Sequence, residues 1–206
     1  MMKEGLLLVI SGPSGTGKGT VCKELLKSEK DIKLSVSATT REPRNGEVNG
    51  INYYFLDKDT FERQISEDEF LEYAKVYDNY YGTPKKYVID EINEGNDVLL
   101  EIDIQGALQV KEKYPKGIFI FILPPSMNEL KKRIVGRGTE SEESISKRFG
   151  SALDEINYVK EYDYFVINDT VEKAVEKIRG IIRSEKCKVN ENIEDLISKF
   201  KEEISC

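Results

Sequence analysis

A continuous apolar run that stops at a glycine-rich loop constrains the fold of this chain more than any other feature. The run is Leu6, Leu7, Leu8, Val9 and Ile10, and the loop is Gly12, Pro13, Ser14, Gly15, Thr16, Gly17, Lys18, Gly19 and Thr20. Glycines let successive backbone N–H groups turn inward, and a lysine adds a charge that reaches the outer phosphates of a nucleotide. An amphipathic stripe follows, so a helix is expected to begin near Gly17 with its positive dipole end at the loop. The pattern predicts a buried strand, a phosphate loop and a helix, and therefore binding of a nucleoside triphosphate; an ordinary glycine-rich turn is the alternative.

Composition narrows the class of protein. The chain has 206 residues, a net charge of −7 and no histidine. The acidic balance argues against a nucleic-acid partner, and the lack of a long apolar run argues against a membrane segment. Three widely spaced cysteines, Cys22, Cys187 and Cys206, indicate reduced thiols in the cytoplasm. Histidine-based acid–base catalysis is excluded, whereas phosphoryl transfer to an acceptor that is already ionised is not.

The order of the segments predicts a doubly wound α/β fold. Short apolar runs are expected to form a five-stranded parallel sheet from residues 6–11, 34–37, 97–103, 118–123 and 164–168. Capping signals predict the helices between them. Thr83 and Pro84 suggest an N-cap and a first-turn proline of a helix that Gly95 ends. A capping box of Ser126 and Glu129, and an N-cap at Thr170, mark two further helix starts.

One segment departs from the alternation and predicts a small inserted lobe. Residues 39–83 contain aromatic strand candidates at 53–55 and 70–73 around a short helix at 60–65. A polar, glycine-containing segment at 137–146 suits a mobile helical lid. The predicted domain therefore spans 5–185, with a core of 5–38, 84–136 and 147–185. Residues 186–206 are expected to form a C-terminal helical tail.

Three polar clusters are candidates for the site. Arg41 and Arg44 follow hydroxyl residues and flank a proline, which suits a single phosphate group, although ordinary surface arginines are as good an interpretation. Glu101 and Asp103 alternate at the end of a buried strand, so both are expected on one face near the phosphate loop; a solvent-facing strand end is the less favoured alternative. A third set consists of arginines around the lid, which would close over the phosphate group during transfer. The alternative is an exposed, charged helix face, and this alternative is favoured for Lys131 and Lys132. The members of this third set are Arg133, Arg137 and Arg148.

At this point the chain resembles the guanylate kinases, from about residue 5 to residue 185. The resemblance rests on ordered motifs at residues 11–18, 37–44 with Gly46 and Glu47, 79–83, 101–106 and 137–140. It implies a P-loop core, a mobile GMP-binding lobe and a lid. It also implies that Mg²⁺ bridges the phosphates of ATP and that ATP and GMP are converted into ADP and GDP. Oligomeric state is left open between monomer and homodimer.

The resemblance implies roles for individual residues. Gly12 to Thr20 would bind the ATP phosphates with Lys18 nearest the transferred group, and Asn168 would lie near adenine. Arg133, Arg137 and Arg148 match arginines that converge on the phosphates. The expected GMP-phosphate clamp is Arg41, Arg44, Tyr53 and Tyr81, and the expected guanine-reading residues are Ser37, Glu72 and Thr83. Asp103 matches a residue near GMP and the metal. Gly19 stands where the common loop pattern has Ser or Thr, so Thr20 and Asp103 are expected to contact Mg²⁺ at most indirectly.

The residue types agree with guanine as the acceptor base. A carboxylate such as Glu72 can accept from both N1–H and N2–H₂ of guanine, and a hydroxyl of Ser37 or Thr83 can donate to O6. Adenine would leave these groups unpaired. Two alternatives remain open: a noncatalytic guanylate-kinase-like module that binds proteins, and a kinase for another nucleoside monophosphate. A GTPase switch is poorly supported, because no NKxD-like guanine-reading motif is present.

Overall fold

The computed structural model describes the backbone of residues 4–135, 142–189 and 193–204, and their side chains except at 142–148, 195–196 and 204. Its larger sheet has five strands in the order β2-β7-β1-β8-β9, and all four strand pairings are parallel. The strands are β1 (Leu7–Ser11), β2 (Ile32–Leu34), β7 (Asp97–Glu101), β8 (Ile118–Leu123) and β9 (Tyr164–Ile167). The predicted doubly wound α/β fold is therefore confirmed.

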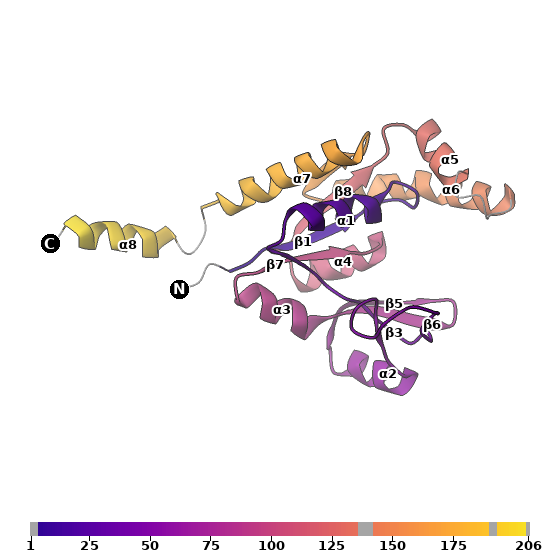
Figure 1. Ribbon diagram of the computed structural model, residues 1–206, viewed down its shortest axis with the longest axis horizontal. Helices are drawn as coiled ribbons and strands as arrows, with labels where there is room; N and C mark the ends of the chain where they lie inside the picture. The colour runs from indigo at the N-terminus through magenta and orange to yellow at the C-terminus, as the bar shows by residue number, and fades with distance from the viewer. Residues whose placement is uncertain (1–3, 136–141, 190–192, 205–206) are drawn as a thin grey trace.

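Helices cover both faces of this sheet (Figure 1). Leu8 and Ile10 pack with α1 (Lys18–Ser28) and α7 (Val171–Lys186) on one face. Leu7 and Val9 point to the opposite face and pack with α3 (Lys85–Asn93) and α4 (Ile104–Lys113). Successive residues of a strand alternate between faces, which explains why a continuous apolar run is required here.

A second, four-stranded sheet is built from residues 38–84, in the order β4-β3-β6-β5. Its strands are β3 (Ala38–Thr39), β4 (Tyr54–Phe55), β5 (Phe70–Val76) and β6 (Asn79–Pro84), and α2 (Lys58–Ser66) packs on it. The sheet is mixed, because β3 pairs parallel with β4 and antiparallel with β6. Phe61 stacks on Phe70 with ring centroids 4.4 Å apart and on Tyr80 at 5.3 Å. These rings give the predicted lobe its own small core.

Some predicted boundaries are wrong. The strand expected at 34–37 is β2, Ile32–Leu34, because the chain leaves the large sheet after Ser35 and pairs in the second sheet from Ala38. The strand expected to reach residue 103 ends at Glu101, since Asp103 is the N-cap of α4 and accepts a 2.7 Å hydrogen bond from the N–H of Gly106. Thr83 lies in β6 rather than at a helix N-cap, a position that Pro84 takes.

The N-caps predicted at Ser126 and Thr170 and the helix end predicted at Gly95 are confirmed. The Ser126 hydroxyl accepts from the N–H of Glu129 at 3.1 Å at the start of α5 (Met127–Val135). Thr170 is the N-cap of α7, and Gly95 follows α3 with a φ of 90°. Such a left-handed residue after a helix favours glycine.

The remaining helices are α6 (Glu142–Ile156), the 3₁₀ helix η1 (Asn157–Glu161) and α8 (Ile193–Ile204). Figure 1 shows α8 extending beyond α7, away from the sheet. The side chains of the predicted lid, residues 137–146, all lie outside the described ones. Among the described residues, no helix is long and apolar enough to cross a bilayer.

Candidate active site

The glycine-rich loop lies at the C-terminal end of β1 and leads into α1. Gly12, Gly15 and Gly17 all have positive φ angles, of 142°, 88° and 90°, and Gly17 is the N-cap of α1. A Cβ at Gly12 would lie 2.4 Å from the carbonyl oxygen of Ile122, so β8 leaves no room for a side chain there. The loop therefore turns its backbone around a helix N-terminus, the geometry that binds phosphate.

Lys18 lies over this loop. Its Nζ donates to the carbonyls of Gly12 and Pro13, the latter at 3.2 Å. Burial lowers the pKa of Lys18, and the nearby carboxylate of Glu101 acts in the opposite direction. A partly buried ammonium held by neutral carbonyl oxygens can bind an anionic ligand, because an anion is a stronger acceptor than a carbonyl.

Arg133 and Asn168 bring two distant segments to the loop. Arg133 Nη1 donates to the carbonyl of Asn168 at 3.2 Å and lies 3.5 Å from the carbonyl of Thr16, while its Nε donates to Glu129. The amide of Asn168, 3% exposed, donates to the carbonyl of Thr16 at 2.7 Å. Arg133 therefore lies beside the phosphate loop, and its role toward the phosphates stays a prediction. The described amide contact of Asn168 is to the loop backbone.

A cavity of about 250 Å³ lies between the second sheet and the C-terminal end of β7. Five of the predicted acceptor residues line it: Ser37, Tyr53, Glu72, Tyr81 and Asp103. Thr83, 1% exposed, lies directly behind Glu72. The cavity thus gathers residues that are up to 66 positions apart in the sequence, from Ser37 to Asp103.

Glu72 is the buried acid of this cavity. Its Oε1 accepts a 2.6 Å hydrogen bond from the Thr83 hydroxyl. Its Oε2 lies so close to Gly106 that a Cβ there would approach it to 2.9 Å. Burial raises the pKa of Glu72 to about 7. A desolvated carboxylate without a cationic partner among these contacts suits a neutral ligand group that offers hydrogen-bond donors.

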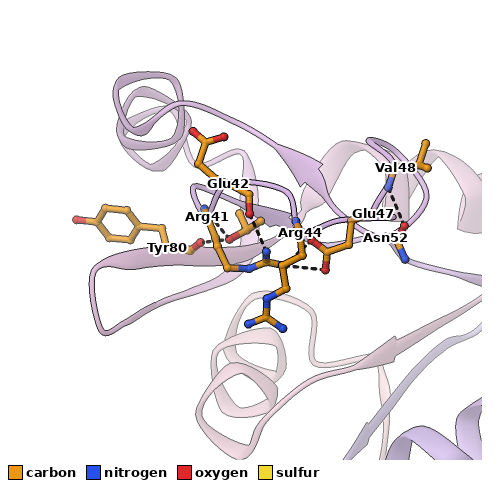
Figure 2. Close-up of polar contacts among 8 residues, drawn as sticks. Arg41, Glu42, Arg44, Glu47, Val48, Asn52 and Tyr80 are labelled. Atoms are coloured by element: carbon orange, nitrogen blue, oxygen red, sulfur yellow. Dashed lines mark hydrogen bonds and ion pairs between the residues drawn. The ribbon is translucent and has the colours of Figure 1, made fainter.

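The two predicted phosphate-clamp arginines lie on the loop after β3 (Figure 2). The Arg41 guanidinium pairs with Glu47 at 2.9 Å and lies 5.5 Å from the centroid of the Tyr53 ring. Tyr53 contacts Tyr81 with ring centroids 6.0 Å apart. Figure 2 shows the Arg44 side chain extending away from the Arg41–Glu47 pair. Because both tyrosines line the cavity, Arg41 lies next to its wall.

Glu101 connects the two halves of the site. It lines the 250 Å³ cavity, yet its Oε1 lies 3.1 Å from where a Cβ of Gly19 would be. Burial raises the pKa of Glu101, and Lys18 opposes that shift. The missing side chain at Gly19 therefore faces a carboxylate, while Thr20 is exposed on α1.

Sequence reasoning left two of these acids without a role. Glu101 was recognised as a strand-end carboxylate, but its approach to Gly19 depends on the pairing of β1 with β7. Glu47 was noted only as part of a motif. Its position three residues after Arg44 was the one sequence signal that it could contact the arginine loop. Arg137 lies outside the described residues, and Arg148 lies in α6 where its side chain is not described.

A larger cavity, of about 810 Å³, lies between the second sheet and α3. Its lining includes Tyr54, Leu56, Gln64 and Tyr87, and none of the predicted site residues. A large hollow is a usual candidate for a binding site, but the acids with raised pKa values, Glu72 and Glu101, line the smaller cavity, and Glu101 also lies beside Gly19 of the phosphate loop.

Comparison with known proteins shows the family to which the chain is similar. The family model described as guanylate kinase matches residues 4–185. A guanylate kinase of Caldanaerobacter subterraneus subsp. tengcongensis is 66% identical over 98% of this chain and 97% of the relative. One from Clostridium acetobutylicum is 65% identical over 98% of this chain and 96% of the relative. The crystal structure of guanylate kinase from Anaplasma phagocytophilum superposes with a TM-score of 0.76 at 35% identity, covering 97% of this chain and 96% of that one.

Proposed function

This chain belongs to the guanylate kinase family, and we propose that it transfers the γ-phosphoryl group of ATP to GMP, giving ADP and GDP, through the residues gathered around Glu101. The observation that carries the proposal is the shared wall of the two halves of the site. Glu101 lines the acceptor cavity and also lies beside Lys18 and Gly19 of the phosphate loop. Two nucleotides bound there would present their phosphates to each other.

The donor half would bind ATP through residues 12–20 and Asn168. Backbone N–H groups of the loop and the N-terminus of α1 would hold the phosphates. Lys18 would follow the transferred group, and Arg133, Arg137 and Arg148 would offset its developing charge. To contact the transferred group, the Lys18 ammonium must leave the carbonyls of Gly12 and Pro13. It then exchanges two neutral hydrogen-bond acceptors for an anionic one.

The acceptor half would bind GMP. Glu72 would accept from N1–H and N2–H₂ of guanine, with Ser37, Thr83 and Asp103 completing the contacts. Arg41, Arg44, Tyr53 and Tyr81 would bind the phosphate. A phosphate monoester has a second pKa of about 6, so its attacking oxygen is already ionised at neutral pH. The reaction then needs no general base, in agreement with a chain that has no histidine.

The oxygen groups near the loop fit Mg²⁺. The described residues contain no cluster of three or more acids or cysteines able to hold a metal by themselves. Glu101 supplies a carboxylate beside Gly19, where the common loop pattern has a hydroxyl residue, and Asp103 supplies another on the cavity wall. Such hard oxygen donors suit Mg²⁺. When bound, the ion would neutralise phosphate charge. Glu101 and Asp103 would help to hold it, with Thr20 a more distant contributor.

A noncatalytic protein-binding module is the alternative from another class, and its strongest argument is that fold alone does not establish activity. Such a module has no need for a lysine held over an intact phosphate loop, as Lys18 is here. A kinase for another nucleoside monophosphate is disfavoured by the buried pair of Glu72 and Thr83, which suits donors of the guanine edge. We place the enzyme in the cytoplasm, as a monomer or homodimer without a nucleic-acid partner, on its net charge of −7 and on free Cys22 and Cys187 among the described residues.

A coupled assay of ADP release tests the proposal. ATP and Mg²⁺ are supplied with GMP, AMP, CMP or UMP in turn, and we expect rapid ADP release only with GMP. ADP release with none of the four would favour the protein-binding module, and a preference for another monophosphate would favour the second alternative.

A further inference from the structure

Glu47 lies at the centre of the loop that carries Arg41 and Arg44. Its carboxylate contacts Nη2 of Arg41 through both oxygens, at 2.9 Å and 3.0 Å. Oε2 also accepts a 2.7 Å hydrogen bond from the backbone N–H of Arg44. One carboxylate therefore holds the side chain of one arginine and the backbone of the other (Figure 2).

The backbone between the two partners forms a tight turn. The N–H of Glu47 donates to the carbonyl of Arg44 at 3.0 Å, and Gly46 in between has a φ of 88°. A positive φ at the third residue of a turn favours glycine. The Glu47 carboxylate thus bonds back to the first residue of its own turn, and the turn and the Arg41 pair support each other.

Other contacts hold Arg41 from different sides. Its Nη1 donates to the carbonyl of Glu42 at 2.7 Å, and its guanidinium lies 5.5 Å from the Tyr53 ring centroid. The side chains of Arg41 and Glu47 are only 15% and 19% exposed. Hydrogen bonding from Arg41 is the main reason that the pKa of Glu47 is lowered, so this acid is ionised at neutral pH.

We propose that Glu47 is a positioning residue of the acceptor site, which fixes Arg41 and Arg44 in the geometry that binds the GMP phosphate. This inference rests on the proposed function. A fixed arginine loses less conformational freedom when its ligand binds, which strengthens binding. By its charge alone, however, an acid at this place repels the phosphate. Positioning and charge therefore predict effects of opposite sign when Glu47 is neutralised.

Glu47→Gln separates the two effects. Glutamine has nearly the same size, but its single carbonyl oxygen cannot keep all three contacts, and its NH₂ group would face the donors of Arg41 or Arg44. If Glu47 positions the clamp, the Kd for GMP should rise about tenfold, the equivalent of losing one charge-assisted hydrogen bond. If only charge matters, GMP should bind as tightly as before or more tightly.

Glu42→Gln is the matched control. It removes one negative charge from the same loop but keeps the backbone carbonyl that Arg41 uses. Figure 2 shows the Glu42 side chain directed away from the Arg41–Glu47 pair. Its Kd for GMP should stay within about twofold of the wild-type value or decrease slightly.

The experiment is calorimetric titration of the wild type and both variants with GMP and with ATP, followed by steady-state kinetics. Weaker GMP binding in Glu47→Gln alone, with ATP binding unchanged, supports the inference, as does a raised KM for GMP with little change in kcat. Equal GMP affinity in Glu47→Gln and Glu42→Gln overturns it. Absence of GMP binding to the wild type would instead overturn the proposed function.

Discussion

The side-chain amide of Asn168 donates a 2.7 Å hydrogen bond to the carbonyl of Thr16, 152 residues away in the chain. A Cβ at Gly17 would lie 2.7 Å from the same amide nitrogen. The end of β9 thus presses directly against the turn of the phosphate loop. This contact suggests that Asn168 supports the loop, while its predicted approach to adenine stays a prediction.

Loop support and an adenine contact can be separated with Asn168→Ala. Loss of the hydrogen bond to Thr16 should raise the KM for any nucleoside triphosphate donor, about tenfold for ATP and for GTP alike. Loss of an adenine contact would raise the KM for ATP much more than the KM for GTP. Donor kinetics at saturating GMP distinguish the two, and Asn168→Asp, which replaces the donor with an acceptor, should be at least as damaging as alanine.

Lys18→Ala should lower kcat by about 10²–10³-fold or more while the fold persists, because Lys18 interacts most strongly with charge that develops during transfer. Lys27→Ala, on the exposed surface of the same helix, is the control and should retain wild-type turnover. The coupled assay measures the rates, and circular dichroism with thermal unfolding reports the fold. Near-normal turnover of Lys18→Ala would remove Lys18 from the mechanism.

Glu72→Ala should reduce the preference for GMP over AMP, because the carboxylate that accepts from the guanine edge is gone. Sites that hydrogen-bond a substrate in this way can discriminate by about 10⁴-fold. We expect most of that discrimination to disappear, through a loss of kcat/KM for GMP rather than a gain for AMP. A variant that keeps the full preference would show that Glu72 does not select the acceptor.

GMP affinity should depend on pH through Glu72. Its pKa is raised to about 7 by burial, and guanine requires the ionised form. Binding below pH 7 must therefore release a proton, and affinity should fall up to about tenfold per pH unit as the pH decreases. The GMP phosphate also titrates near pH 6. Calorimetry of the wild type and Glu72→Gln from pH 5.5 to 8.5 separates the contributions, since the variant keeps only that of the phosphate; identical profiles would contradict the prediction.

Gly106→Ala should weaken GMP binding without affecting ATP. The added methyl group would approach Glu72 Oε2 to 2.9 Å, while Thr83 holds the other oxygen at 2.6 Å. The carboxylate must then turn or lose its hydrogen bond, and we expect an increase of about tenfold in the KM for GMP. Gly150→Ala is the comparison, because a Cβ at Gly150 meets no described atom within 4 Å.

Local sequence pattern was enough to predict the large sheet, the phosphate loop and the starts of α1, α5 and α7. Apolar runs such as that of β8 were located to the residue, because burial on both faces demands continuous apolar side chains. Boundaries were wrong where tertiary contacts compete with a local signal. Thr83 has the chemistry of an N-cap, but its hydroxyl instead donates to Glu72 and its backbone stays in β6.

The sequence by itself determined the backbone chemistry of the site: glycines where φ must be positive, a lysine at the start of α1 and arginines beside a proline. Only the tertiary structure decided what surrounds the acids and amides of the site and how their pKa values shift. Glu72, Glu101 and Asn168 owe their surroundings to strands and loops far away in the chain. The reason is that local sterics depend on neighbouring residues, whereas desolvation and hydrogen bonding depend on which elements pack together.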